Sequence, residues 1–187
     1  SGDPQISYRT QNGDLRRATW DGSNWILETV AAGPGVGHGS VIALQPNNGQ
    51  VHILHRNALT GELLHTQRGT HNWTTAIVAN NLVPNTDITL EFDKSNVLHA
   101  TYYANNNLHY LTWNGSSWTD EVVFGDVITG NGFSLAFDNA NRPYIAYANF
   151  GNDYLQYEWF DGLDWQRRFM LRHPGGDQPR IAISSND

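Results

Sequence analysis

The sequence repeats one short motif four times, and each copy ends in a tryptophan. The motif reads TWDGSNW at 19–25 and TWNGSSW at 112–118, and weaker copies occur at 68–73 and 159–165. The closing residues follow one another at spacings of 48, 45 and 47 positions: Trp25, Trp73, Trp118 and Trp165. A period of this size is typical of repeat architectures, in which each copy forms one supersecondary unit. This repeat restricts the fold more than any other feature of the chain.

Each repeat divides into four short apolar runs that are separated by turn residues. In one repeat the runs are TLEF, LHATYY, LHYLTW and WTDEVV, at 89–92, 98–103, 108–113 and 118–123. Runs of this length that are rich in Val, Ile, Tyr and Trp predict strands, and the Asn-Gly and Asp-Gly pairs between them predict tight hairpins. Four strands in a meander, repeated radially, form the blades of a β-propeller. A β-sandwich with an accidental likeness between its strands is the alternative.

The repeats account for the whole sequence. The units are residues 41–88, 89–133, 134–179, and 180–187 combined with 1–40. We therefore predict an all-β fold, a single four-bladed propeller over 1–187 with four antiparallel strands in each blade. The run RIAI at 180–183 would be the first strand of the last blade and would pair with the three N-terminal strands, which closes the ring. The alternative is an eight-bladed ring that two chains form together.

Composition excludes several classes of protein. The chain has a net charge of −7 and no cysteine. The absence of cysteine excludes a disulfide framework and thiol chemistry. The acidic balance argues against a nucleic-acid partner, because such proteins carry basic patches and an acidic chain repels phosphate. No apolar run approaches the ~20 residues of a membrane span, so we expect neither nucleic acid nor a membrane-spanning segment.

The loops that join one predicted blade to the next are the longest and least regular parts of the chain. Loops on a rigid scaffold often carry function, and these loops should gather at one mouth of the propeller axis. They place different polar residues there, as the binding of an asymmetric ligand requires: His38, Asp87, Asn131 and Asp177. Solvated loop ends are the alternative interpretation.

Two charged residues replace small or apolar residues on the predicted inner strands. Glu91 stands where the other repeats have alanine, and Arg180 stands where they have Val, Thr or Ser. In a four-bladed ring the two residues belong to opposite blades and could meet near the axis. A buried charge needs a partner, so they predict either an ion pair that plugs the tunnel or an anchor for a polar ligand. The candidate ligand-binding set is therefore His38, Asp87, Glu91, Asn131, Asp177 and Arg180.

The histidines and acidic turns do not predict a metal site. His55 and His65 stand where other repeats have tyrosine, and we expect them to be cross-strand neighbours. A metal needs three or four converging ligands, and the sequence supports only pairs. The Asp/Asn turns lack the dense acids and glycine of a calcium loop. No nucleophile elbow, phosphate loop or zinc-binding helix is present, so we expect no metal and no cofactor.

The repeat resembles a propeller repeat common in bacterial secreted and surface proteins, with the general form SLAFD…N…P.IAY……L.Y..WNG..W, and all four units carry it. The predicted four-bladed closure is similar to that of hemopexin-like domains. Those usually join the first and last blades by a disulfide, which this chain lacks, so their function is not implied. Propeller lectins with repeats of about 47 residues are similar too. The WDGSNW segment resembles the Asp-box of sialidases, but Asp21 and Gly22 are adjacent whereas the Asp-box separates them, so sialidase chemistry is not implied.

Three functions stay open at this level. We favour a non-catalytic binding module for a small molecule or glycan, above all a carbohydrate, because Trp and Tyr faces stack on sugar rings and Asn, Asp and Gln bind hydroxyls. The first alternative is a small hydrolase or lyase with one acid/base site at the axial mouth. The second is a structural or assembly domain of a larger surface protein. The resemblance implies a secreted or cell-surface location, although the sequence shows no signal peptide, and we expect a monomer or a homodimer.

Overall fold

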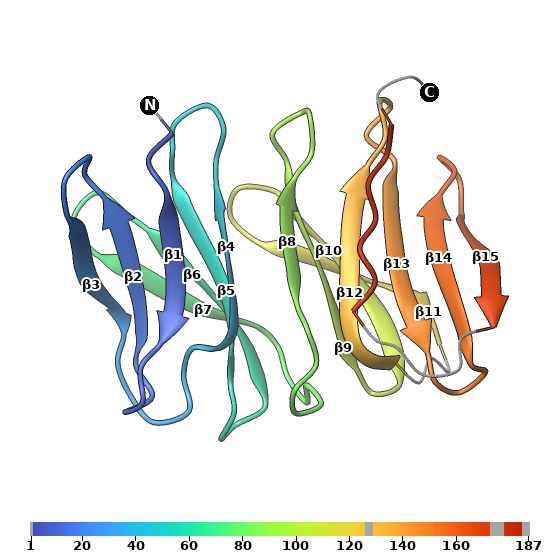
Figure 1. Ribbon diagram of the computed structural model, residues 1–187, viewed down its shortest axis with the longest axis horizontal. Helices are drawn as coiled ribbons and strands as arrows, with labels where there is room; N and C mark the ends of the chain where they lie inside the picture. Colours follow the sequence, from blue (N-terminus) through green and yellow to red (C-terminus); the bar gives the residue numbers. More distant parts are fainter. Residues whose placement is uncertain (1, 126–128, 173–177, 185–187) are drawn as a thin grey trace. The chain divides into compact units, whose positions relative to one another are not determined.

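The computed structural model describes residues 2–125, 129–172 and 178–184. These residues form fifteen β-strands and no helix (Figure 1). The chain divides into two compact units, Ser1–Pro84 and Asn85–Asp187, which we call the N-terminal unit and the C-terminal unit. Each unit contains two antiparallel sheets. The predicted all-β class is confirmed.

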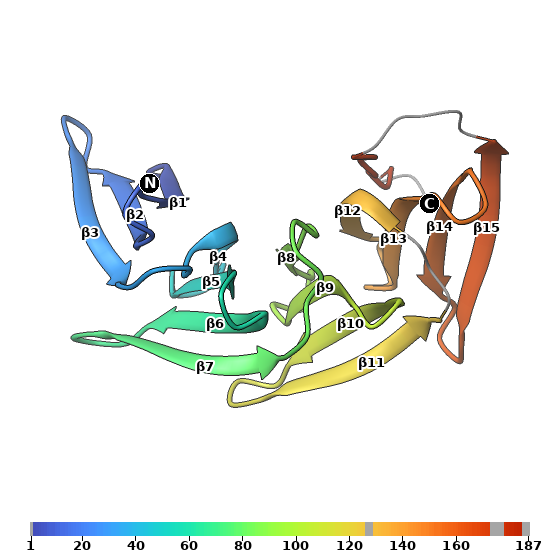
Figure 2. The same cartoon turned by 90° about the horizontal axis from the view of Figure 1, so that it is seen from below.

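The N-terminal unit holds sheets 1 and 2. Sheet 1 consists of β1 (Gln5–Arg9), β2 (Leu15–Trp20) and β3 (Trp25–Ala31). Sheet 2 consists of β4 (His38–Leu44), β5 (Val51–Asn57), β6 (Glu62–Arg68) and β7 (Trp73–Ala79). Each strand pairs with the strand that follows it in sequence, so both sheets are meanders, and Figure 2 shows the strands of sheet 2 in this order.

The C-terminal unit holds sheets 3 and 4, which have the same order. Sheet 3 consists of β8 (Thr89–Phe92), β9 (Leu98–Ala104), β10 (Asn107–Trp113) and β11 (Trp118–Phe124). Sheet 4 consists of β12 (Thr129–Phe137), β13 (Pro143–Asn149), β14 (Tyr154–Phe160) and β15 (Trp165–Arg172). In all four sheets the closing tryptophan of the motif begins the outer strand, as the sequence predicts.

The turn before the outer strand is built alike in three of the sheets. Asp21 Oδ1 accepts hydrogen bonds from the backbone nitrogens of Ser23 and Asn24, at 2.8 and 2.7 Å. Asn114 and Asp161 accept the equivalent pairs of hydrogen bonds at 2.8 to 3.0 Å. The residue that follows each of them has a φ of 99°, 99° or 108°: Gly22, Gly115 and Gly162. An Asx turn followed by a left-handed glycine therefore explains why the sequence repeats DG and NG.

One irregularity recurs at the same position of all four sheets. The outer strand carries one extra residue, a β-bulge, opposite the start of the strand before it. The register shifts lie at Leu15/Arg16, Leu63/Leu64, Leu108/His109 and Leu155/Gln156. The extra residues are Val30, Val78, Val123 and Met170. A bulge shared by four sheets supports the alignment of the four repeats.

An apolar core fills the space between the two sheets of each unit. In the N-terminal unit, side chains of both sheets form one buried cluster: Leu15, Val30, Val51 and Ile53. In the C-terminal unit the corresponding cluster contains Tyr103, Leu108, Tyr110, Val123, Phe133, Leu135, Ile145 and Tyr147. The two sheets of each unit thus pack face to face, which is the arrangement of neighbouring blades.

The predicted closing strand is not formed in the described part of the chain. Sheet 1 has three strands, and residues 180–183 belong to no strand. The backbone nitrogen of Ile181 donates a hydrogen bond to the hydroxyl of Ser134 in β12 at 3.0 Å, and Figure 1 shows this segment running beside β12. Closure of the last blade and the four blade boundaries therefore stay predictions.

Candidate functional site

The two predicted inner-strand charges lie in the C-terminal unit without a bond between them. Glu91 is exposed in β8, opposite His99 in the register, and partial desolvation raises the pKa of its carboxyl group. Arg180 is also exposed, and its guanidinium donates a hydrogen bond to the carbonyl of Pro179 at 3.0 Å. The predicted Glu91–Arg180 ion pair is not among the ion pairs of the described residues. Their role in ligand binding stays a prediction.

The four predicted loop residues are placed separately. His38 begins β4 in the N-terminal unit, and desolvation together with the charges of Arg9 and Arg56 lowers its pKa. Asp87 is half-buried shortly before β8. Asn131 lies in β12, but its side chain and all of Asp177 are outside the described residues. A ligand-binding role for these four residues stays a prediction.

A polar cluster that the sequence did not predict joins sheets 1 and 2. Arg17 donates to Glu28 Oε1 at 2.6 Å, and Trp73 Nε1 donates to Glu28 Oε2 at 3.2 Å. A nitrogen of Arg68 lies 3.3 Å from the same Oε2. Both guanidinium groups lie beside the Trp73 ring, with their central carbons 5.8 and 5.3 Å from its centroid. We call Arg17, Glu28, Arg68 and Trp73 the first Trp–Glu site.

The same contact recurs between sheets 3 and 4. Trp165 Nε1 donates to Glu121 Oε1 at 2.6 Å. In both units the glutamate follows the closing tryptophan of the earlier sheet by three residues, and the tryptophan begins the outer strand of the later sheet. The two guanidinium groups are replaced by aromatic rings. Tyr110 and Phe160 lie 5.1 and 5.8 Å from the Trp165 ring, between centroids. We call Tyr110, Glu121, Phe160 and Trp165 the second Trp–Glu site.

Both sites reach the surface of the protein. The Glu28 side chain is 31% exposed and Arg68 is 35% exposed, whereas Arg17 is 14% exposed. Glu121 is exposed, and each of the two tryptophans is half-buried. Each site therefore offers a solvated carboxylate held against an indole that is anchored in the core. Such a combination can accept hydrogen bonds from hydroxyl groups and pack against an apolar surface at once.

A buried hydrogen-bond network lies in sheet 4 beside the second Trp–Glu site. Glu158 is fully buried, and its Oε1 accepts from Arg167 Nε and from the Tyr147 hydroxyl, each at 2.6 Å. The Arg167 guanidinium lies 3.8 Å from the centroid of the Phe124 ring. Burial raises the pKa of the Glu158 carboxyl, although its bonded partners oppose the shift.

Sheet 2 has a neutral network at the equivalent positions. His55 Nε2 lies 2.9 Å from the Thr66 hydroxyl oxygen, which lies 2.8 Å from that of Thr75. His55, Thr66 and Thr75 occupy the repeat positions of the tyrosine, glutamate and arginine in sheet 4. The repeat therefore builds the same three-strand network from uncharged groups in one unit and from an ion pair in the other.

The prediction that His55 and His65 are cross-strand neighbours is wrong. In the register His55 lies opposite Leu64, and His65 lies opposite Leu54, so the two histidines are on opposite faces of sheet 2. His65 instead contacts His52, with their ring nitrogens 3.0 Å apart and the rings stacked. Desolvation lowers the pKa of His65 to about 3 and those of His52 and His55 to about 4.

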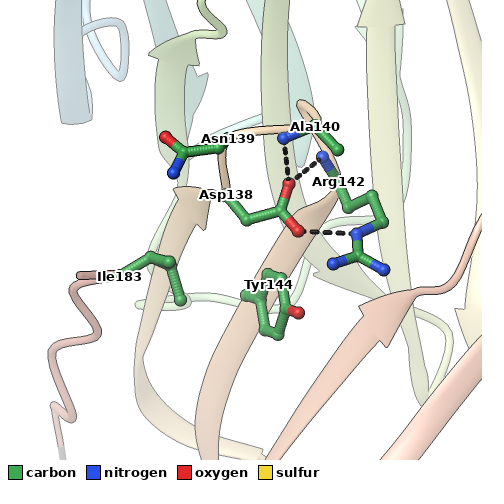
Figure 3. Close-up of a pocket in the computed structure, with 6 residues that line it drawn as sticks. All are labelled: Asp138, Asn139, Ala140, Arg142, Tyr144 and Ile183. Carbon is green, nitrogen blue, oxygen red and sulfur yellow. Dashed lines mark hydrogen bonds and ion pairs between the residues drawn. The ribbon is translucent and has the colours of Figure 1, made fainter. Parts of the chain in front are cut away.

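A hollow of about 350 Å³ lies at the turn between β12 and β13 (Figure 3). Asp138, Arg142, Tyr144 and Ile183 are among the residues that line it. Asp138 accepts hydrogen bonds from the backbone nitrogens of Ala140 and Arg142 and from Arg142 Nε. Its carboxylate therefore holds the turn together, and its side chain is 7% exposed, against 31% for Glu28. Because so little of the carboxylate reaches solvent, the hollow is a weaker candidate than the Trp–Glu sites.

Two further classes of site are not found where the structure describes the chain. No group of three or more His, Cys, Asp or Glu side chains is placed to hold a metal ion among the described residues. Within the same residues, no helix is long and apolar enough to cross a membrane.

Part of the signal for the Trp–Glu sites was present in the sequence. Glutamate follows the closing tryptophan by three residues in two of the repeats, where the other two have Ala76 and Arg168. The repeat does not reveal that this carboxylate reaches the tryptophan of the next sheet, because that contact depends on how the sheets stack. For this reason Glu28 and Glu121 were not predicted.

Comparison with known proteins gives structural matches alone. No family model matches the sequence, and no curated protein is similar to it in sequence. The fucose-specific lectin from Aleuria aurantia matches over 92% of this chain and 60% of its own, with a TM-score of 0.69 and 17% identity. A triple arginine-to-alanine mutant of AofleA from Arthrobotrys oligospora matches over 92% and 57%, with a TM-score of 0.65 and 18% identity.

A fucose lectin from Kordia zhangzhouensis, solved with methyl-fucoside, matches over 70% of this chain and 97% of its own, with a TM-score of 0.51 and 19% identity. The chain spans about three-fifths of the length of the two longer proteins. At these identities the likeness concerns the fold. Together with the four meander sheets, it shows that the chain has an all-β propeller fold.

Proposed function

We propose that the protein is a non-catalytic carbohydrate-binding module and that its ligands bind at the two Trp–Glu sites. The observation that carries the proposal is the recurrence of one contact. Trp73 donates to Glu28 and Trp165 donates to Glu121 from equivalent positions of two different units. Solvated carboxylates held against an indole at two equivalent places suit a ligand that is bound more than once by each molecule.

The chemistry of both sites suits a sugar. A carboxylate accepts hydrogen bonds from neighbouring hydroxyl groups, and such charge-assisted bonds are stronger than neutral ones. The half-buried tryptophan supplies a rigid apolar surface for the C–H face of a sugar ring. Arg68, which is 35% exposed, adds donors for ring and hydroxyl oxygens at the first site, whereas the half-buried Phe160 supplies an aromatic surface at the second.

The structural neighbours support the same class of ligand. The proteins from Aleuria aurantia and Kordia zhangzhouensis are described as fucose lectins. We therefore take methyl-fucoside as the first probe, and a secreted or cell-surface location remains part of the proposal. A ligand-binding role for the six loop and inner-strand residues predicted from sequence remains a separate proposal.

The test begins with a glycan array, run with and without EDTA, followed by calorimetric titration of methyl-fucoside or of the best ligand. Glu28→Gln and Glu121→Gln keep the size of each side chain and remove its charge. Hydrogen bonds to charged groups contribute ~1.5–3 kcal/mol, so each change should weaken binding at its own site about tenfold or more. The double variant should lose binding.

Glu62→Gln is the matched control, because Glu62 bonds to Thr60 and lies apart from both sites in the sequence repeat. It should bind as the unmodified chain does. An array without any bound glycan would contradict the proposal and would favour the hydrolase or lyase alternative or the structural one. Unchanged binding by the double variant would move the ligand to another surface.

A further inference from the structure

The first Trp–Glu site shows how a cation is held against the Trp–Glu contact. Arg68 Nη1 lies 3.3 Å from Glu28 Oε2, and the central carbon of the same guanidinium lies 5.3 Å from the centroid of the Trp73 ring. Arg17 lies beside this ring too, at 5.8 Å, and donates to Glu28 Oε1. A carboxylate and an indole together therefore bind each guanidinium, because both attract positive charge.

The second Trp–Glu site has the same carboxylate and indole but no cation of its own. Phe160 and Tyr110 have the repeat positions of the two arginines. Glu121 takes part in none of the ion pairs among the described residues. In the same part of the chain, no cation–ring contact involves Trp165. The groups that bind a cation at the first site are therefore present at the second, and neutral rings replace the cations.

Acidic residues surround the second site. Asp161 and Asp164 are exposed in the turn that leads into Trp165, where the first site has Gly69 and Asn72. The two sites therefore differ in the sign of their charge as well as in their rings. Negative charge around a site attracts cationic ligands.

Negative charge also acts on the rings of the second site. Desolvation raises the pKa of Tyr110, and the charges of Asp93 and Glu121 raise it further. A phenol loses its proton less readily when carboxylates lie near it, because they disfavour the phenolate. The same carboxylates favour a cation bound in that place.

The guanidinium groups near the site are bound to other carboxylates. Arg167 Nε lies 2.6 Å from the buried Glu158, and Arg142 Nε lies 2.6 Å from Asp138. Arg168 follows Arg167 in β15 and therefore points to the other face of sheet 4. These arginines do not replace the pair that the first site has.

We propose that the second Trp–Glu site binds the ammonium group of an amino sugar, with Glu121 as its counterion and with Trp165 and Phe160 as the surfaces against which the sugar packs. The inference rests on the proposed function and adds the class of sugar. The ammonium takes the place that the guanidinium of Arg68 has at the first site. Because the first site already contains two cations, which repel an ammonium, this preference belongs to the second site alone.

The test compares glucosamine with glucose, which has a hydroxyl group in place of the amine. Both are titrated calorimetrically at pH 6, at which the amine carries its charge, into the Glu28→Gln variant, in which the first site is weakened. We expect glucosamine to bind about tenfold more tightly, because it gains a charge-assisted hydrogen bond and a cation–π contact. Added salt should reduce this preference, because salt screens exposed charges.

Two further substitutions in the same variant should remove the preference for glucosamine. Glu121→Gln keeps the size of the side chain and removes the counterion, and it should remain folded, by circular dichroism, because Glu121 is exposed. Phe160→Arg supplies a guanidinium at the position of Arg68. Glu62→Gln is the control, since it removes a carboxylate that bonds to Thr60 in the other unit, and the tenfold preference should remain.

Equal affinities for the two sugars in the Glu28→Gln variant would overturn the inference, and so would a preference that survives Glu121→Gln. In both cases the binding of glucose or methyl-fucoside would leave the proposed function in place. A chain that binds no sugar at all would contradict the inference and the proposed function together. The titrations therefore distinguish failure of the sugar class from failure of the carbohydrate-binding proposal.

Discussion

The two units differ in where their ion pairs lie: those of the N-terminal unit are partly exposed, and that of sheet 4 is buried. The first site has Arg17, Glu28 and Arg68 near the surface, whereas the network below it, His55–Thr66–Thr75, is neutral. The second has aromatic rings beside its tryptophan, and the network in sheet 4 contains the buried Glu158–Arg167 ion pair. The repeat therefore fixes the backbone and the Trp–Glu contact and leaves the distribution of charge free.

The difference teaches which charges matter for stability and which for recognition. Exposed ion pairs contribute little, because water solvates both partners and salt screens them. A buried pair does not by itself make a fold more stable, but removal of one partner leaves a charge without compensation. Substitutions near the surface of the first site should therefore change binding, whereas substitutions in the network of the second unit should change folding.

The largest effect is expected at Arg167. Arg167→Met leaves Glu158 buried and unpaired, which should lower the free energy of unfolding of the C-terminal unit by about 3–5 kcal/mol. Thr75→Val is the matched change, because Thr75 has the repeat position of Arg167 in sheet 2 and is exposed. It should lower the free energy of unfolding of the N-terminal unit by less than about 1 kcal/mol. Urea unfolding, with the units distinguished by NMR, measures both. Equal losses of unfolding free energy would show that the buried ion pair and the neutral network contribute alike to stability.

Acid should weaken the N-terminal unit more than the C-terminal one. The folded-state pKa values of His52, His55 and His65 lie below the usual 6.5 because of desolvation. Their contribution to stability is therefore complete above pH 6.5 and is lost as the pH falls towards their pKa values of about 4, 4 and 3. For His55 the loss reaches roughly 3 kcal/mol at pH 4.

Among the described residues of the C-terminal unit, one histidine has a pKa shifted in the same direction, His99. Glu158 in the C-terminal unit has the opposite effect on stability. Its raised pKa means that the folded state binds the proton more tightly than the unfolded state does, so a lower pH favours folding at this residue. Urea unfolding at pH 7.5 and pH 4.5, followed for each unit by NMR, tests the contrast. A greater loss of stability in the C-terminal unit at pH 4.5 would contradict the prediction.

The smallest effect should come from exchanging the more exposed residues of the two sites, Arg68 and Phe160, which share one repeat position. Arg68→Phe gives the first site an aromatic ring of the second, and Phe160→Arg makes the reverse change. Each should alter the affinity for a sugar about tenfold at its own site, or ~1.4 kcal/mol. Arg68→Phe should change stability by less than about 1 kcal/mol. Titration of each variant together with Glu121→Gln or Glu28→Gln isolates the site, and an unchanged affinity would show that residues 68 and 160 do not contact the ligand.

The fold could be predicted from the sequence because its signals are local. The Asx turns at Asp21, Asn114 and Asp161 and the tryptophans after them depend on residues a few positions apart. The alternation of apolar residues locates the strands, and the period counts the sheets. Closure by residues 180–183 could not be decided in this way, since a run of apolar residues does not specify which edge it pairs with.

The candidate site was harder to predict because it depends on how strands and sheets meet. His55 and His65 were paired from the repeat alignment, but strand register puts them on opposite faces. Glu91 was selected because it replaces an alanine, and its exposure in β8 could not be foreseen from that substitution. The Trp–Glu contact needs the bulged outer strand and the stacked sheets together, so the glutamates alone did not predict it.

The meander order of every sheet also bears on how the chain reaches its fold. Each strand pairs with the strand that precedes or follows it in the sequence, and contacts of this kind form quickly because little loop entropy is lost. Each sheet can therefore assemble soon after its last strand leaves the ribosome, before the next repeat is synthesised. Sheet 1 leaves the ribosome before sheet 2, so its core residues Leu15 and Val30 stay uncovered until Val51 and Ile53 follow, and in this interval the nascent chain is open to mispairing.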